Sequence, residues 1–250
     1  MVKSAEELVR DFGKLNKIIM EISLRGTKIV EVPYFANQLG EINNSILIVG
    51  ERLGGTEGVS ETIHQMGYAD VTTTDILSSE PDSWLKTNTT WNHIAIDFVQ
   101  FDESMKFDRV ISISVFEHFG FWFGGKHMAN GLVENDLCKW NHDIVGINKA
   151  CRLLRNSQSK LIITLPAGPY MNYEPSGEPF LRSYDFRRQA IVKAELDRNG
   201  YVVENETFFY SSDFYDWKEV GNEINDPRNY GAYCATSPNV IWGLTVSPKS

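Results

Sequence analysis

Short apolar runs and longer amphipathic segments alternate along the chain. Runs rich in branched and aromatic residues predict strands at residues 46–49, 70–76, 93–98, 107–115, 160–165, 202–210 and 240–246. Apolar residues at helical spacing predict helices at residues 4–26, 58–66, 141–154 and 184–198. This order predicts an α/β fold with a mostly parallel seven-stranded sheet, helices on both faces and an antiparallel C-terminal edge.

The pattern divides the chain near residue 40. Residues 1–40 are expected to form a helical extension or cap, because Ser4 and Glu7 have the spacing of a capping box and helical periodicity follows. Residues 41–250 hold all the predicted strands and are expected to form the main domain. A late stretch, residues 213–233, is polar and aromatic, and its pattern fits a flap and an oligomer contact equally well.

Composition and charge narrow the class of partner. With 24 Lys and Arg against 33 Asp and Glu, the net charge is −9, which argues against nucleic acid as the partner. No apolar run reaches the ~20 residues of a membrane helix, so no integral membrane segment is expected. The first residues lack the apolar core of a secretory signal. Three cysteines without a CxxC pair predict reduced thiols and a cytoplasmic protein.

The exits of the first three predicted strands carry residues suited to a nucleoside. The glycine-rich loop 50–58 lets the backbone approach a ligand, but it matches neither the Walker loop nor the dinucleotide fingerprint. Asp75 ends the second strand, where a carboxylate can accept hydrogen bonds from two ribose hydroxyls. Asp97 and Phe98 end the third and suit the amine and the ring of adenine. A tight turn, a surface aspartate and a core phenylalanine fit these positions as well.

The exit of the fourth predicted strand, residues 114–122, combines a Glu-His pair with several aromatic residues. Histidine titrates near neutral pH and can serve as a base, so His118 is a catalytic candidate. Together with Glu117 it could also ligate a metal. A structural histidine bonded to nearby backbone is the third reading of this pair.

Five segments, in this order, resemble the motifs of class I S-adenosylmethionine-dependent methyltransferases: ILIVGERLGG, VTTTDIL, IDF, FDRVISISVFEHFGF and CRLLRNSQSKLIITLPAG. The resemblance covers about residues 45–168. It implies a Rossmann-like fold and S-adenosyl-L-methionine as the cofactor. The cofactor-binding residues that it implies are Gly50, Glu51, Gly54, Asp75, Ile76, Asp97, Phe98 and Ser114.

Within this family, VTTTD, FEHFGF, the His142-Asp143 pair and LPAG most resemble methyltransferases that modify surface glycans and sugars. The resemblance implies O-methylation of a sugar hydroxyl in a glycan or sugar precursor. A hydroxyl benefits from a base within hydrogen-bond reach, and His118 is the first candidate, ahead of His127, His142 and Asp143. The acceptor side is predicted to include Glu117, Phe121, Trp122, His127, Tyr170 and Tyr173. The oligomeric state stays open.

Three positions depart from the family pattern. Ile48 stands where an acid is usual, and Arg52 stands where the middle glycine is usual. Ser114 replaces the first acid of the Glu-x-x-Glu-His motif through which some relatives bind a metal, so no metal site is expected. Two alternatives follow: a small-molecule or protein methyltransferase with another acceptor, and a non-catalytic interaction module, which Ile48 and Arg52 favour.

Overall fold

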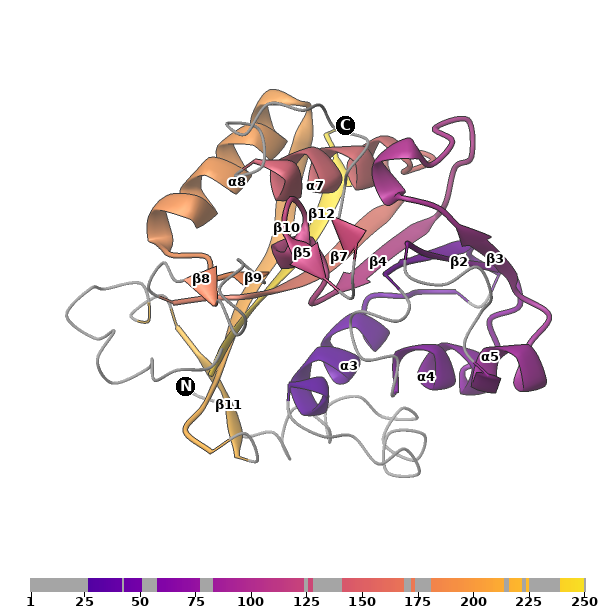
Figure 1. Ribbon diagram of the computed structural model, residues 1–250, viewed down its shortest axis with the longest axis horizontal. Helices are drawn as coiled ribbons and strands as arrows, with labels where there is room; N and C mark the ends of the chain where they lie inside the picture. Colours follow the sequence, from indigo (N-terminus) through magenta and orange to yellow (C-terminus); the bar gives the residue numbers. More distant parts are fainter. Residues whose placement is uncertain are drawn as a thin grey trace.

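The computed structural model describes residues 27–41, 43–50, 58–76, 83–123, 126–127, 141–168, 172–173, 181–213, 216–221, 224 and 239–249. Within these residues, eight strands form one central sheet (Figure 1). Its spatial order is β11 (Trp217–Val220), β10 (Tyr201–Ser211), β12 (Val240–Pro248), β7 (Lys160–Pro166), β4 (Arg109–Ile113), β1 (Ile46–Val49), β2 (Val71–Asp75) and β3 (Asn92–Ala95).

The strand directions confirm the predicted fold class. The neighbours β3, β2, β1, β4 and β7 run parallel. β12 runs antiparallel to β7 and β10 on either side, and β11 pairs antiparallel with β10. The expected seven strands are all present, and β11 is an eighth that the sequence pattern did not predict. It lies in the stretch 213–233, where too few residues alternate to indicate a strand.

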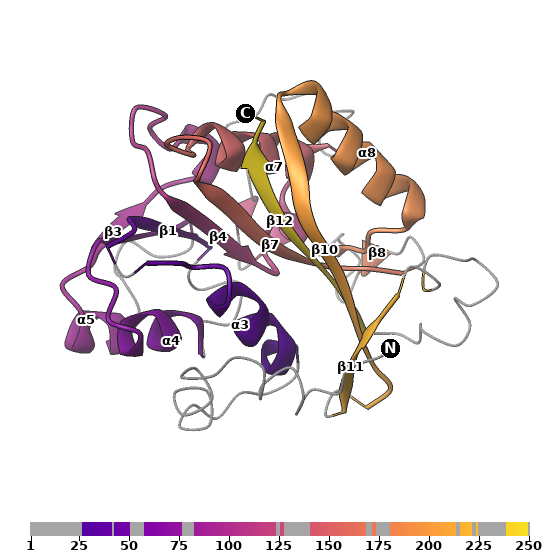
Figure 2. The ribbon, with the colours of Figure 1, turned by 180° about the vertical axis from the view of Figure 1, so that it is seen from behind.

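Helices cover both faces of the sheet (Figures 1 and 2). One face carries α3 (Lys28–Ala36), α4 (Val59–Gln65) and α5 (Ser83–Asn88), and the other carries α7 (His142–Arg152) and α8 (Phe186–Arg198). Two 3₁₀ turns, η1 (Phe98–Gln100) and η2 (Phe116–His118), follow β3 and β4. Two short antiparallel pairs complete the described elements: β5 (Trp122–Phe123) with β6 (Lys126–His127), and β8 (Asn172–Tyr173) with β9 (Leu181–Arg182).

The apolar run of β1 is buried on both faces because successive side chains of a strand point to opposite sides. Ile46 and Ile48 join the apolar cluster beneath α3 and α4. Leu47 and Val49 join the cluster beneath α7 and α8. The central strands therefore separate two apolar cores, and their exits share one end of the sheet.

The helix α3 belongs to this packing although it lies inside the predicted extension of residues 1–40. The hydroxyl of Tyr34 lies 3.1 Å from that of Thr245 in β12. A Cβ on Gly243 would come within 2.9 Å of the Tyr34 ring, so the glycine lets α3 lie close to the sheet. Residues 1–26 lie outside the described residues, and the division at residue 40 stays a prediction.

Two capping aspartates explain where helices begin. The predicted strand 93–98 stops at Ala95, because the Asp97 side chain accepts a 3.2 Å hydrogen bond from the Val99 N–H and starts η1. Asp185 caps α8 in the same way, accepting from the Arg188 N–H at 2.8 Å. The first cap matters for function because it fixes Asp97 at a strand exit.

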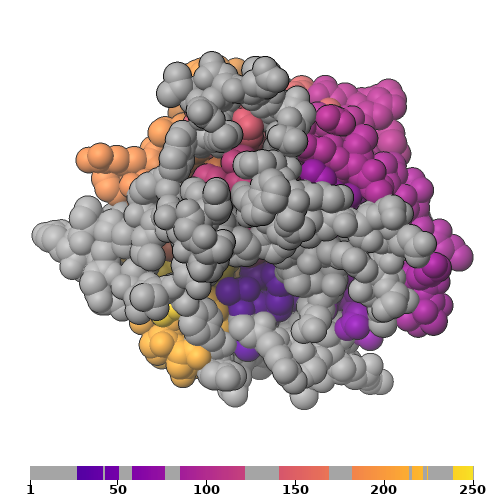
Figure 3. Space-filling model, viewed as in Figure 1, coloured from indigo at the N-terminus to yellow at the C-terminus, as the bar shows by residue number. Residues whose placement is uncertain are grey.

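In the space-filling view, the purple and magenta N-terminal elements lie on one side and the orange α8 and β10 on the other (Figure 3).

None of the helices in the described ranges is long and apolar enough to cross a membrane.

Candidate functional site

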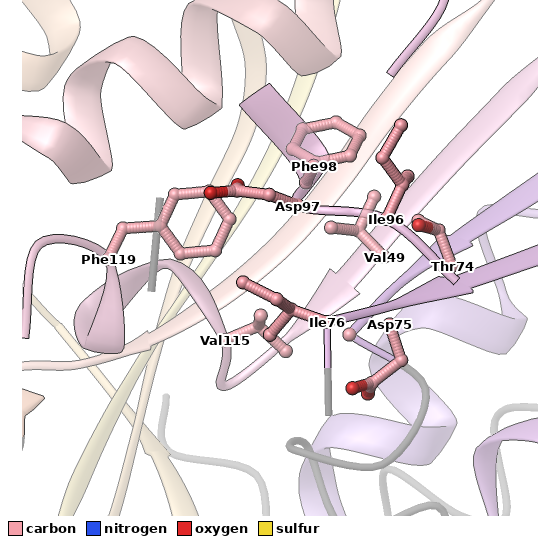
Figure 4. Close-up of a pocket in the computed structure, with 10 residues that line it drawn as sticks. Val49, Thr74, Asp75, Ile76, Ile96, Asp97, Phe98, Val115 and Phe119 are labelled. Carbon is pink, nitrogen blue, oxygen red and sulfur yellow. The ribbon is translucent and has the colours of Figure 1, made fainter. Parts of the chain in front are cut away.

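A pocket lies where the sheet order reverses. From β1 the chain continues to β2 and β3 on one side, whereas β4 and β7 lie on the other, and ligands of such sheets bind outside this point. The pocket encloses about 260 Å³ of empty space, including its open mouth. It is lined by Val49, Gly50, Thr74, Asp75, Ile76, Ile96, Asp97, Phe98, Val115 and Phe119 (Figure 4).

Gly50 forms the end of the pocket at the exit of β1. Its φ of +72° is a conformation that residues with a Cβ rarely adopt. A Cβ here would also lie only 2.4 Å from Cγ1 of Val115. Both the backbone conformation and the lack of space therefore require glycine at this position. The other predicted residues of this loop, Glu51 and Gly54, lie outside the described residues.

The two predicted aspartates stand on neighbouring strand exits. Asp75 ends β2 and is only 2% exposed, while Asp97 follows β3 and caps η1. Their carboxylates point in different directions (Figure 4). The pocket therefore offers hydrogen-bond acceptors at two separate places, with the apolar side chain of Ile76 also in its lining.

Aromatic rings form another wall of the pocket. The rings of Phe98 and Phe119 have centroids 6.3 Å apart, and Phe116 meets Phe119 edge-on at 5.0 Å. A Cβ on Gly146 of α7 would lie 2.6 Å from the Phe119 ring, so this glycine leaves room for it. The wall thus depends on α7 as well as on the strand exits.

Sequence reasoning found five of the ten lining residues and missed Val49, Thr74, Ile96, Val115 and Phe119. Val49 and Thr74 are detectable, because they directly precede predicted ligand residues at strand ends. Phe119 lies six residues beyond the end of β4, directly after η2, in a turn whose shape the sequence does not specify.

Ser114 is not in the pocket lining. Its hydroxyl donates a 2.5 Å hydrogen bond to Oε1 of Glu31 in α3, and Thr164 in β7 donates to the same oxygen at 2.5 Å. Burial raises the pKa of Glu31, but the nearby Lys28 ammonium and these hydrogen bonds more than offset it, so the pKa lies below its usual value. The carboxylate of Glu31 thus links α3 to two strand exits, a role that sequence reasoning missed.

Glu117 and His118 are both buried in η2, with Oε1 and Nε2 4.0 Å apart. Burial raises the pKa of Glu117 to about 8, and the negative charge of Glu31 adds to the shift. Glu117 is therefore mainly protonated at pH 7. Its Oε2 atom has no hydrogen-bond partner within the described part of the chain. Neither residue lines the pocket, and their catalytic and acceptor roles stay predictions.

Asp143 and His142 are buried at the start of α7. The Asp143 carboxylate lies 2.7 Å from Nη1 of Arg182, accepts from the Tyr184 hydroxyl at 2.8 Å and also pairs with Arg188. The structure thus gives Asp143 cationic and phenolic partners, and its predicted catalytic role stays a prediction, as does that of His142.

The predicted acceptor residues lie around η2 and the two short hairpins. Phe121 is buried, with the Arg182 guanidinium 4.3 Å from its ring centroid. Trp122 and His127 are paired residues of β5 and β6, and Tyr173 belongs to β8. The side chains of these three residues and all of Tyr170 lie outside the described residues. Across the described ranges, no group of three or more His, Cys, Asp or Glu side chains could hold a metal ion.

Comparison with known proteins identifies the fold. No protein-family model matches the chain, and no curated protein matches it. The 1,6-didemethyltoxoflavin-N1-methyltransferase of Burkholderia thailandensis, solved with S-adenosylhomocysteine, is similar with a TM-score of 0.53 at 11% identity, over 98% of this chain and 87% of that chain. This chain has the fold of class I methyltransferases.

Two further methyltransferase structures are similar over nearly their full length. The N-methyltransferase NodS of Bradyrhizobium japonicum gives a TM-score of 0.52 at 10% identity, over 96% of this chain and 98% of that chain. An S-adenosylmethionine-dependent methyltransferase of Clostridium acetobutylicum gives 0.53 at 9% identity, over 96% and 99%. Identities this low establish the methyltransferase fold, and the activity must be argued from the site.

Proposed function

We propose that this chain is an S-adenosyl-L-methionine-dependent methyltransferase whose acceptor is a sugar hydroxyl of a glycan or sugar precursor. One observation carries the proposal: at the reversal point of a methyltransferase fold, the exits of β2 and β3 bring Asp75 and Asp97 into one apolar pocket. The similar structures from Burkholderia and Bradyrhizobium contain S-adenosylhomocysteine, which supports the same cofactor here.

The residues present fit the adenosyl group. An adenosine has ribose hydroxyls at one end and a ring amine at the other, and the two carboxylates offer separate acceptors for them. Ile76, Phe98 and Phe119 supply apolar surface for the base.

When bound, S-adenosyl-L-methionine supplies a methyl group on a sulfonium and leaves as a neutral thioether. The chain has to align the acceptor and remove one proton from its hydroxyl. We assign the proton to the His118 imidazole, because η2 follows the exit of β4 beside the pocket. Asp143 does not accept this proton in our assignment. It forms ion pairs with Arg182 and Arg188 and so stabilises the packing around the site.

A sugar acceptor is supported by the segments FEHFGF and LPAG and by the aromatic residues that follow β4. A nitrogen acceptor is the second candidate. The similar enzymes from Burkholderia and Bradyrhizobium are both N-methyltransferases by name, which favours testing amines beside sugars.

Calorimetric titration with S-adenosylhomocysteine tests the cofactor. Asp75→Ala and Asp97→Ala should each weaken binding about tenfold or more, because each removes a charged hydrogen-bond acceptor worth ~1.5–3 kcal/mol. Asp102→Ala is the matched control, since Asp102 is exposed and its side chain bonds only to Ser104 among the described contacts. Its affinity should stay within about twofold of wild type. No binding by wild type at millimolar ligand would contradict the proposal.

A panel of sugars and amines, incubated with S-adenosyl-L-methionine and read by mass spectrometry, tests the acceptor. Methylation of a sugar oxygen supports the first candidate. Methylation of amines alone would replace it with the second.

A further inference from the structure

Arg182 of β9 is a buried cation, with its side chain only 1% exposed. Its Nη1 atom lies 2.7 Å from Oδ1 of Asp143, and its Nη2 atom donates a 2.6 Å hydrogen bond to the carbonyl oxygen of Phe119. Its guanidinium also stacks on the ring of Phe121. One side chain therefore joins α7, β9 and the turn after η2.

This turn contributes Phe119 to the pocket wall (Figure 4). Because the wall is made by a turn, its position depends on what holds the backbone. Arg182 donates a hydrogen bond to the Phe119 carbonyl, and Gly146 leaves room for the ring. The guanidinium thus fixes a residue of the pocket without lining the pocket itself.

We propose that Arg182, anchored by Asp143, is a positioning residue that holds Phe119 in place for the adenosyl group. The proposal rests on the proposed cofactor, and it assigns to Asp143 a role in cofactor binding instead of proton transfer. Arginine is needed because its planar fork presents donors to two acceptors at once, whereas a lysine ammonium is a point charge. Removing the arginines would leave the buried Asp143 carboxylate without a counter-charge, which would strongly destabilise the folded protein.

Arg188 makes a matched comparison possible. It pairs with the same Asp143 carboxylate, and its side chain also donates a 3.1 Å hydrogen bond to Oδ1 of Asn141. Changing either arginine disturbs Asp143, but only Arg182 contacts the Phe119 carbonyl among the described hydrogen bonds. Loss of cofactor affinity in one variant alone therefore separates positioning from general damage.

The experiment is a double-mutant cycle on S-adenosylhomocysteine affinity, measured by calorimetry on variants whose fold is verified by circular dichroism. Arg182→Lys should weaken binding about tenfold, and Arg188→Lys should stay within about twofold. Phe119→Ala should weaken binding as well. In the Phe119→Ala background, Arg182→Lys should cause no further loss, because its effect passes through Phe119.

Equal losses in the two arginine variants, or additive losses of Arg182→Lys and Phe119→Ala, would overturn the proposal. If Arg182→Lys does not fold, Asp143→Asn replaces it in the cycle, since it keeps the shape and loosens the anchor. Asp143→Asn should then weaken binding in the wild-type background and not in Phe119→Ala; unchanged affinity would overturn the proposal. Failure of wild type to bind the ligand would instead reject the proposed function, and this inference with it.

Discussion

The Ser114 hydroxyl donates a 2.5 Å hydrogen bond to Oε1 of Glu31 and so ties the exit of β4 to helix α3. Ser114 has a φ of +54°, the one positive value found at a non-glycine residue in the described ranges. Val115 follows directly and lines the pocket. Glu31 therefore stabilises a strained turn that the cofactor pocket depends on, and the strain makes the contact testable.

Substitutions at Ser114 should separate the hydrogen bond from the backbone strain. Ser114→Ala loses a bond to a charged acceptor, worth ~1.5–3 kcal/mol, and keeps the strain. Ser114→Gly loses the same bond but relieves a left-handed conformation that costs roughly 1–2 kcal/mol. Urea unfolding should therefore rank Ser114→Gly as the more stable variant.

Thr164→Val is the matched control, because Thr164 donates to the same Glu31 oxygen from a regular strand. It should lower the free energy of unfolding and leave S-adenosylhomocysteine affinity within about twofold of wild type. A glycine variant less stable than the alanine variant would contradict the role of strain.

Glu117 should make stability depend on pH. The buried carboxyl keeps its proton up to a pKa of about 8, whereas in the unfolded chain it ionises above its usual value of 4.5. Between these values the unfolded state loses a proton that the folded state keeps, so the free energy of unfolding falls as pH rises. The fall contributed by this group is at most about 1.4 kcal/mol per pH unit.

Glu117→Gln has no proton to lose, so its stability relative to wild type should rise steadily from pH 5 to pH 8. Urea unfolding at four pH values measures the difference. Glu41→Gln, at an exposed position, is the control. Its free energy of unfolding should differ from that of the wild type by the same amount at every pH. Parallel curves for Glu117→Gln and wild type would mean that Glu117 is already ionised in the folded protein.

Gly50→Ala should remove cofactor binding. The added Cβ would lie 2.4 Å from Val115 at a φ of +72°, so the exit of β1 or β4 has to move. Gly67→Ala provides the control, because Gly67 has a φ of +88° and no atom within 4 Å of its Cβ position. It should cost only the backbone penalty of roughly 1–2 kcal/mol and bind S-adenosylhomocysteine normally. Equal affinity in both alanine variants would show that the approach of Val115 to Gly50 is unimportant.

His118→Ala should lower turnover about 10²-fold or more, with S-adenosylhomocysteine affinity within a few-fold of wild type, because a base acts on the acceptor and not on the cofactor. The reaction is followed with whichever acceptor gains a methyl group in the panel. His64→Ala, on the exposed side of α4, should leave turnover unchanged. Retained turnover in His118→Ala would locate the base elsewhere.

Local patterns predicted the strand framework and half of the pocket. Residues 46–49 were predicted with the observed bounds of β1, and parallel pairing then brings Asp75 and Asp97 to one end of the sheet. Glu31 and Phe119 could not be found in this way. Glu31 lies in a segment predicted as an extension, and its partners come from strands far along the sequence.

Asp143 shows what local patterns cannot supply. Its place beside His142 made it a catalytic candidate, and that role stays a prediction. The partners that define its electrostatics, Arg182 and Arg188, reach it only through the packing of β9 and α8 against α7. Sequence adjacency cannot reveal an ion pair that tertiary packing creates.

A crystal structure with S-adenosylhomocysteine would show directly whether the strand exits bind the adenosyl group. We expect the ribose hydroxyls within hydrogen-bond distance of Asp75 and the adenine amine near Asp97. The base should lie between Ile76 and the aromatic wall of Phe98 and Phe119. A nucleoside bound elsewhere, with side chains filling the space between β1 and β4, would contradict it.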